Sequence, residues 1–372
     1  MKKFIIFVAA IAMVGAFVAT AMADVSLYGS ARFRTYYADS SKEATGSGYS
    51  DGDLEWRMGH LTRFGANFKS DKITGKFEMD ARAGGAGATG NIESDSGASR
   101  LGNTRLRLLW GEYDFGSWKF MVGQNYPLYD AVVSGINYYS GGLQKMGGIA
   151  YDVARTSQMR FTINNLRIAF LPTDTSAGGV TGYTSDVDVM LPKIEARYDL
   201  KMDWGALNFI GGYQTYDGVN ASDADKSINS WVAGVRGKFN FGPAYLNAAV
   251  TYRQNGGNYG VWTVVDEGAK FDGTDVQDST AFGAVAALGY KINDSNTIEA
   301  SYGYVSSEND LSGTNEDKAS AIALMYKYTV APGFYIVPEF IYQDNKEKTV
   351  SNVETDKGDV TIFGVFWRID FK

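Results

Sequence analysis

Apolar and polar residues alternate along most of the chain from residue 25 onward. The strictest case runs from Lys193 to Leu200, where Ile194, Ala196 and Tyr198 take every second position and charged residues fill the positions between them. A period of two predicts a β-strand with one apolar face and one polar face. The same pattern recurs in segments of about ten residues, so we expect an all-β fold.

Sixteen such segments follow one another, and their connections alternate between short turns and long polar loops. An even number of two-faced strands, with the long loops at one end and both termini at the other, predicts a transmembrane antiparallel β-barrel of 16 strands. A soluble sandwich has shorter strands and no reason to sort its loops by length. We expect long loops over residues 38–54, 84–103, 172–190, 218–227, 254–278, 307–317 and 344–358.

The first 23 residues have the composition of an export signal. Lys2 and Lys3 precede the apolar run from Phe4 to Thr20, and Ala21-Met22-Ala23 has the small-x-small form of a cleavage site. We therefore predict a cleaved signal peptide over 1–23 and a single barrel domain over 24–372. A membrane anchor helix is the alternative, and the strand-like polar continuation favours cleavage. No later segment approaches the ~18 consecutive apolar residues of a spanning helix.

Composition narrows the classes of function. Without Lys2 and Lys3 the chain carries 33 basic and 42 acidic residues, a formal charge of −9, which argues against a nucleic-acid partner. The chain has no cysteine, which excludes disulfides and thiol chemistry. The 44 glycines, 45 tyrosines and phenylalanines and only 6 prolines suit many strands and turns.

One long segment does not fit the alternating pattern. From Pro127 to Gly148 there is no clear period, and glycines are mixed with aliphatic and aromatic residues that water would not solvate well. Loops of this length are uncommon in a compact fold unless they have a function. We expect this third loop, about residues 127–156, to fold into the lumen of the barrel and narrow it.

Several stretches are similar to the general bacterial porins, which are trimeric sixteen-stranded diffusion channels of the outer membrane. The most specific runs from Phe115 to Asp130 and resembles the strand that begins their constriction loop; the others are Val25–Gly29, Thr62–Lys69 with Gly75–Asp80, and the last strand with Trp367 and Phe371. Two positions depart from the family pattern: Gln124 stands where an arginine is common, and Lys372 follows the usual terminal aromatic residue.

The resemblance implies partners and a location. It implies a passive channel in the bacterial outer membrane, in contact with membrane lipid and lipopolysaccharide, and inserted by the barrel-assembly machinery through the last strand. It also implies a homotrimer, and the loop of 84–103 is long enough to reach a neighbouring subunit. The small solute that passes is left open, and a substrate-specific channel of the same fold is the alternative.

A basic wall is the candidate functional site. The period-two pattern places these residues on inward faces of the first strands: Arg32, Arg34, Arg63, Lys69, Lys76, Arg82, Arg105 and Arg107. In porins such a wall faces the inward loop across the pore, and in that loop Asp130 is the acidic residue within the matched motif. Fixed charge in a narrow pore selects ions. We expect a mild anion preference that the acidic outer loops oppose, hence weak selectivity. The alternative is that inward polar residues merely avoid lipid.

Other chemistry has little support in the sequence. His60 is the only histidine, and no nucleophile motif accompanies it, so an enzyme or an adhesive barrel is a less favoured alternative to a channel. Residues 217–225 lack the twelve-position calcium-loop pattern. We therefore predict neither a cofactor nor a metal. The loop tyrosines at 126, 129, 138 and 139 either bind sugars or pack the loop against the wall, and we favour packing.

Overall fold

The computed structural model describes residues 24–44, 52–59, 61–80, 105–130, 132–138, 143–147, 155–175, 183–220, 225–313 and 315–372. The predicted signal peptide, the loop of 84–103, His60 and Arg82 lie outside these residues. Among the described ranges, no helix has the length and apolar character needed to cross a membrane.

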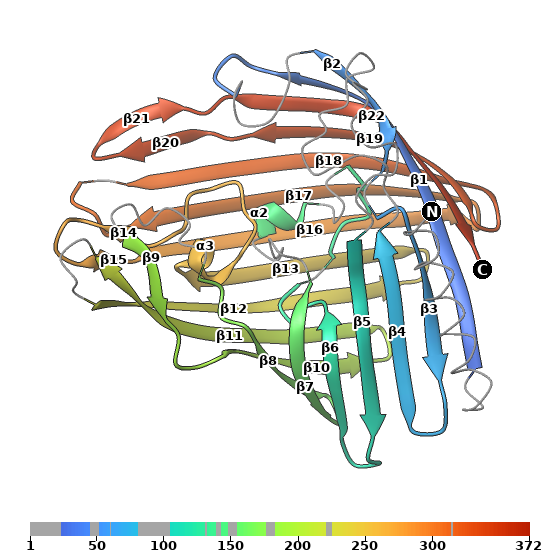
Figure 1. Cartoon of the computed structure of the whole chain (residues 1–372). Coiled ribbons are helices and arrows are strands. Elements are labelled where there is room, and N and C mark those ends of the chain that lie inside the picture. The colour runs from blue at the N-terminus through green and yellow to red at the C-terminus, as the bar shows by residue number, and fades with distance from the viewer. Residues whose placement is uncertain are drawn as a thin grey trace, which may run out of the picture.

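Sixteen antiparallel strands close into a barrel, which confirms the predicted fold class (Figure 1). Each pairs with the next in chain order, and the last pairs with the first along Gly29–Ser40. The strands are β1 (Asp24–Ser40), β3 (Arg63–Lys69), β4 (Ile73–Asp80), β5 (Arg105–Asp114), β6 (Lys119–Asn125), β7 (Thr156–Ile163), β8 (Leu166–Leu171), β10 (Lys193–Met202), β11 (Gly205–Asn220), β12 (Asp225–Phe241), β13 (Ala244–Gln254), β16 (Ser279–Asn293), β17 (Asn296–Asn309), β18 (Glu316–Ala331), β19 (Phe334–Asp344) and β22 (Asp359–Phe371).

Side chains alternate between the two faces of the wall as the sequence predicts. In β1, Arg32 and Arg34 are buried on the inward face, whereas Phe33 between them faces outward. In β16, Phe282 and Leu288 point outward and are 39% and 59% exposed. An apolar outer band of this kind is what lipid contact requires, since lipid offers no partner to polar groups.

The connections are sorted by length. Tight turns at 164–165, 242–243 and 332–333 join β7 to β8, β12 to β13 and β18 to β19. Asn164, Gly242 and Gly333 have positive φ there, the left-handed geometry that two-residue hairpin turns need. β1 begins and β22 ends at this same end, since Asp24 pairs with Lys69 and Phe371 with Gly29. We call it the turn end and the opposite one the loop end.

Additional strands in three of the long connections pair with the wall. β2 (Asp53–Met58) pairs with the half of β1 that extends beyond β3, and β9 (Tyr183–Asp188) pairs with β11 beyond β10. β20 (Glu347–Val350) and β21 (Val353–Asp356) form a hairpin on β18. These segments therefore extend the wall beyond the loop ends of the shorter strands. An unpaired edge exposes backbone N–H and C=O groups, and these segments pair with that edge although their side chains read as loop.

A charge on the outward face of β12 tests the membrane assignment. Val235 lies in the middle of this strand and is 40% exposed, so Val235→Arg would place a cation in the apolar band. We expect the free energy of unfolding in lipid vesicles to fall by about 2–4 kcal/mol, the cost of Arg at the bilayer midplane. Lys238→Arg, which keeps a cation on the inward face of the same strand, is the control and should unfold like the parent in a urea titration. Equal stability of V235R would contradict the lipid-facing assignment.

Candidate functional site: a loop-lined lumen

The third loop, which joins β6 to β7, lies against the inner wall of the barrel. It contains the short helix α2 (Gln144–Gly147), which lies within the barrel outline in Figure 1 and contacts β16 and β17. Its apolar residues are buried against apolar side chains on the inward faces of β16 to β22. The loop members of that cluster are Val133, Ile136, Tyr138, Leu143 and Met146, and the wall members include Val285, Val305, Ala321, Ile341 and Ile362.

Glycines in the wall allow the loop to approach closely. A Cβ atom on Gly283 of β16 would lie 2.7 Å from the carbonyl oxygen of Gly147, and one on Gly303 of β17 would lie 2.5 Å from the Cβ of Met146. Any larger residue at either position would push α2 away from the wall. The tyrosines of the loop follow the same pattern, because Tyr129 and Tyr138 are buried at 0% and 7% exposure. Packing, the favoured reading for these two, is confirmed.

Three inward glutamates hold the backbone of the third loop. Glu195 on β10, Glu299 on β17 and Glu339 on β19 are at most 4% exposed. Each accepts hydrogen bonds from two consecutive loop residues: Leu128 N (2.6 Å) and Tyr129 N (3.2 Å) to Glu195, Ser134 Oγ (2.7 Å) and Gly135 N (2.7 Å) to Glu299, and Asn137 N (2.7 Å) and Tyr138 N (3.1 Å) to Glu339.

These contacts solve the main problem of placing an irregular loop inside a barrel. Backbone N–H groups without a partner are costly when buried, and a carboxylate accepts them in short, charge-assisted hydrogen bonds. Further contacts add to the glutamates: Thr251 Oγ1 donates to Gly147 O at 2.7 Å, and Asn247 Nδ2 donates to Val133 O at 3.1 Å. The third loop is therefore fixed to the wall along its described length.

From the sequence, the period of two places Glu195 opposite the apolar face of its strand, but it does not predict that any of these three glutamates binds the third loop. The sequence nevertheless contains a pattern that indicates a covered lumen side. The inward faces of β16 and β18 carry small apolar residues such as Ala281, Ala287, Ala319 and Ala323, which are all buried. Strands that are apolar on both faces indicate a lumen side covered by another part of the chain.

The predicted basic wall is a network of ion pairs. Arg63 lies 3.4 Å and Arg107 2.6 Å from the carboxylate of Glu78, and Arg105 lies 3.3 Å from Asp80. Arg107 is the extra residue of a β-bulge between β4 and β5, which turns its side chain inward. Glu78 and Asp80 alternate with the arginines, so part of the positive charge is neutralised within the wall itself.

The predicted residues differ in their access to the lumen. The side chains of Arg63 and Arg105 are 24% and 53% exposed. Arg107 is fully buried and also donates to the hydroxyl of Tyr126 at 2.7 Å. Arg34 is 2% exposed and donates to Tyr138 O at 2.8 Å, so it also contacts the third loop.

Lys76, Arg32 and Asp130 are also described, and Lys69 is exposed at the end of β3. Lys76 Nζ lies 5.0 Å from the ring centroid of Tyr28. Arg32 is 7% exposed and its Nε donates to Ser30 Oγ at 2.9 Å. Asp130 is half-buried in the third loop and accepts a hydrogen bond from Gln144 Nε2 at 3.4 Å. Asp130 therefore contacts another residue of its own loop.

A second group of cations, which we call the basic cluster, lies on β7, β8, β10 and β12. Its members are Arg160, Arg167, Arg197, Arg236 and Lys238. Arg167 and Arg197 face each other across β8 and β10 and share Asp199, at 2.9 and 2.7 Å. Arg236 donates to Asn208 Oδ1 at 2.8 Å. The period-two pattern put these residues on inward faces, but only the register of the neighbouring strands brings them together.

The sixth loop, residues 255–278 between β13 and β16, corrects one expectation. It was predicted as an outer loop, yet its residues Asn258, Tyr259 and Ala269 are fully buried. The loop contains α3 (Gly256–Tyr259), β14 (Lys270–Phe271) and β15 (Val276–Gln277), and α3 contacts the wall at β12 and β16. The loop was predicted to lie in water because its residues are polar. In the structure these residues form hydrogen bonds with the wall, and composition alone does not reveal such partners.

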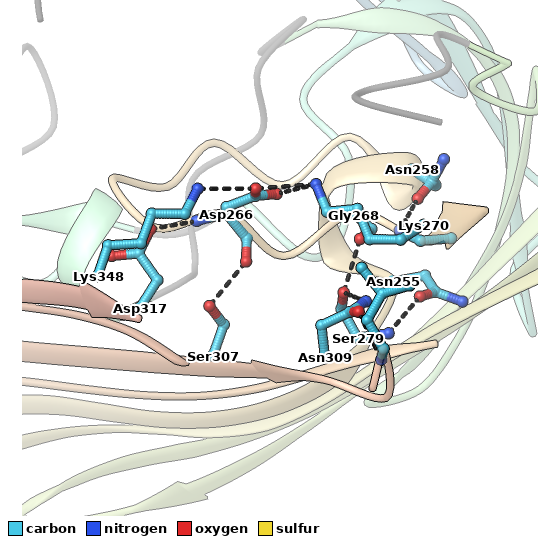
Figure 2. A network of polar contacts seen from close by, with 12 residues as sticks. Asn255, Asn258, Asp266, Gly268, Lys270, Ser279, Ser307, Asn309, Asp317 and Lys348 are labelled. Atoms are coloured by element: carbon cyan, nitrogen blue, oxygen red, sulfur yellow. Dashed lines mark hydrogen bonds and ion pairs between the residues drawn. The ribbon is translucent and has the colours of Figure 1, made fainter. Parts of the chain in front are cut away.

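Polar contacts fix the outer part of the sixth loop (Figure 2). Asp266 binds Lys270 at 2.7 Å and Lys348 at 3.0 Å, and its backbone N–H donates to Asp317 at 2.9 Å. Burial acts to raise the pKa of Asp266, but the hydrogen bonds from the two lysines outweigh it and lower the pKa below its usual value. Asp266 is therefore ionised at neutral pH and links two loops.

A metal centre is not apparent in the described part of the chain, where no three histidine, cysteine or acidic side chains are arranged to hold an ion. The acidic stretch of 217–225 is only partly described.

A closed sixteen-stranded barrel with an apolar outer band, and with loops lining a charged lumen, defines an outer-membrane channel. The chain belongs to the Gram-negative porin family, whose sequence model matches residues 8–348. Comparison with curated protein sequences gives no match.

Solved porin barrels have the same fold. The outer membrane channel DcaP of Acinetobacter baumannii is 19% identical, with a TM-score of 0.72 over 94% of this chain and 97% of that one. OmpT of Vibrio cholerae in its trimer form is 15% identical, with a TM-score of 0.59 over 94% and 99%. The anion-selective porin from Comamonas acidovorans is 12% identical, with a TM-score of 0.58 over 94% and 100%.

The role of Glu299 can be tested by removing its charge. In Glu299→Gln, the hydrogen bonds from Ser134 and Gly135 lose their ionic partner, and hydrogen bonds to charged groups are worth about 1.5–3 kcal/mol each. We expect a lower urea midpoint for the folded barrel and noisier current through the open channel. Glu308→Gln, at an exposed position of the same strand, is the control and should leave both unchanged. A quiet, fully stable E299Q channel would show that Glu299 does not hold the loop.

Proposed function

We propose that this outer-membrane channel passes small hydrophilic solutes and ions by passive diffusion, with weak selectivity. The observation that carries the proposal is the division of the lumen into two sides. The third loop covers one side through buried contacts, while the other side keeps accessible cations such as Arg63 and Arg105. Fixed charges beside a water-filled passage select among ions without binding them tightly. The proposal contains no catalytic step.

The sign of the selectivity follows from the balance of charge. At the basic cluster cations exceed acids, since within the described residues Asp199 is the carboxylate that forms ion pairs with its members. Acids gather in loops near the loop end, where Asp272 and Asp275 are exposed, and they favour cations. The two effects oppose each other, and we propose a small net preference for anions. The anion-selective porin from Comamonas acidovorans has the same fold, which supports the proposal that a barrel of this kind can prefer anions.

Within this proposal the predicted constriction residues have two roles. Arg63 and Arg105 act on passing ions directly, because their side chains are accessible. Arg34 and Arg107 act through the third loop, whose residues Tyr138 and Tyr126 they bind. Arg32, Arg82 and Asp130 remain predicted members of the constriction, and residues 127–156 remain its proposed extent.

Export and assembly follow the family. We propose that residues 1–23 are removed as a signal peptide, that residues 24–372 form one barrel domain, and that the last strand, β22, is read by the barrel-assembly machinery. The outward apolar band contacts membrane lipid and lipopolysaccharide. The barrels assemble as a homotrimer, a proposal supported by the trimer form of OmpT, which has the same fold.

A substrate-specific channel of the same fold is the second candidate. The observation that favours it is the basic cluster, where Arg160, Arg167, Arg197, Arg236 and Lys238 gather on neighbouring strands. Cations arranged in this way bind carboxylates or phosphates when the partner has matching geometry. Saturable block of the chloride current by a small dicarboxylate would support this candidate, whereas block without saturation would leave general diffusion.

Conductance of the purified barrel in a planar bilayer tests the channel proposal. We expect large steps in groups of three, because each trimer contributes three parallel pores. The absence of conductance from correctly folded barrel would overturn general diffusion and reopen the adhesin and enzyme alternatives. Cross-linking in detergent gives an independent count of the subunits.

Replacing the two accessible arginines tests the selectivity. In the double variant Arg63→Gln and Arg105→Gln the lumen loses two positive charges, so the zero-current potential in a salt gradient should move toward cation preference. The shift should be larger near 0.1 M salt, where the Debye length is about 10 Å, than at 1 M, where it is about 3 Å. Lys72→Gln, in an exposed turn, is the control. An unchanged potential would remove Arg63 and Arg105 from the constriction.

A further inference from the structure

We infer that the sixth loop is a second constriction element, and that Tyr259 is the positioning residue through which it sets the place of the third loop. The inference rests on the proposed channel function and adds to it a determinant of solute size. In this arrangement the aperture is set by two inward loops that hold each other, rather than by one loop against a fixed wall.

The sixth loop covers far more of the inner wall than its connection requires. It joins β13 to β16, which are neighbours in the barrel. On one side, Gln214 Nε2 of β11 donates to Asn258 O at 2.7 Å, and Lys193 Nζ of β10 donates to Tyr259 O at 2.5 Å. On the other side, Ser307 Oγ of β17 donates to Asp266 O at 2.7 Å. The loop therefore follows the inside of the barrel from β10 to β17.

The loop also reaches deep into the barrel at Tyr259. The Tyr259 hydroxyl donates to Glu195 Oε1 at 3.0 Å, and Glu195 pairs with Gly212 in the middle of β11. A Cβ atom on Gly212 would lie 1.9 Å from the Tyr259 hydroxyl oxygen, so only glycine at position 212 leaves room for this contact. The neighbouring Gly211 faces outward, and a Cβ there would meet nothing closer than 3.8 Å.

Glu195 joins the two loops. Its carboxylate accepts the backbone N–H groups of Leu128 and Tyr129 from the third loop and the hydroxyl of Tyr259 from the sixth. The Tyr129 and Tyr259 rings also meet edge to face, with centroids 6.0 Å apart. Removing the Tyr259 hydroxyl therefore leaves the acceptor and the ring contact in place but breaks the bond between the sixth loop and the group that holds the third.

A second contact joins the loops nearer their tips. Lys145 Nζ of α2 lies 3.9 Å from the ring centroid of Trp262, and both side chains are half-buried. A cation over an indole face is attracted by the ring's negative face, and the contact strengthens where water is partly excluded. The third and sixth loops thus meet at two separate places.

The remaining contacts keep the sixth loop in its inward position. Glu267 binds Arg253 of β13 at 2.8 Å with both side chains buried. Figure 2 shows the adjoining network, in which Ser279 Oγ donates to Gly268 O at 2.6 Å. Ala269 N also donates to Asn258 Oδ1 at 2.7 Å. A loop anchored at its base, its tip and its outer edge is a fixed part of the aperture.

The test replaces single groups and compares permeation with stability. Tyr259→Phe removes only the hydroxyl, and Gly212→Ala displaces it. With about one hydrogen bond lost, single-channel recordings should show about a fivefold higher occupancy of a second conductance level. Liposome swelling should show faster entry of a trisaccharide relative to a pentose. Gly211→Ala and Tyr213→Phe, both on the outward face of β11, are the matched controls and should behave like the parent.

The outcomes separate this inference from the channel proposal. If the parent conducts, and Y259F and G212A shift permeation while the double variant adds nothing further, the two residues act through one contact and the inference stands. If the parent conducts and Y259F leaves permeation unchanged, the inference fails and the channel remains, even where the urea midpoint of the barrel falls. If G212A does not fold, Y259F alone decides. If the folded parent does not conduct, the channel proposal itself fails.

Discussion

Irregular backbone can lie inside a barrel only where its polar groups find partners, and three glutamates meet that requirement here. Glu195, Glu299 and Glu339 project from strands spaced around the wall and accept the N–H groups of the third loop at successive points. Their spacing around the wall determines the path of the loop, and that path determines which inward faces are covered and which remain open to water. The apolar packing of the loop and the exposure of Arg63 and Arg105 both follow from it.

Much of the fold could be predicted from the sequence because the period of a strand is a local property. Alternation as strict as that from Lys193 to Leu200 identifies both the strand and its outward face. Turn pairs such as Asn164-Asn165 mark the place where one strand ends and the next begins. β2 and β9 were missed because their role is to pair with the free edges of β1 and β11. The need for a partner at an edge is a property of the assembled sheet, and the sequence of the segment that pairs there has no pattern that predicts a strand.

The candidate site was less predictable, and the reason is again physical. Inward faces could be assigned residue by residue, but the neighbours of a lumen side chain come from other strands. Arg107 turns inward at a bulge and pairs there with Glu78, and Arg167 meets Arg197 only through the pairing of β8 with β10. The sixth loop was placed outside because its polar residues suggest contact with water. In the structure the partners of those residues are wall strands and neighbouring loops.

The seam between β1 and β22 has a consequence for the order of events during biogenesis. The bond from Thr35 to Val365 joins residues 330 positions apart, and no strand other than β22 pairs with that edge of β1 in the described chain. The edge of β1 therefore gains its partner only when the far end of the chain reaches it. Contacts of such long sequence separation form slowly, and an open edge invites aggregation meanwhile. Closure of the barrel therefore depends on β22, and a variant that lacks this strand leaves both β1 and β19 with an open edge, however intact the other fifteen strands are.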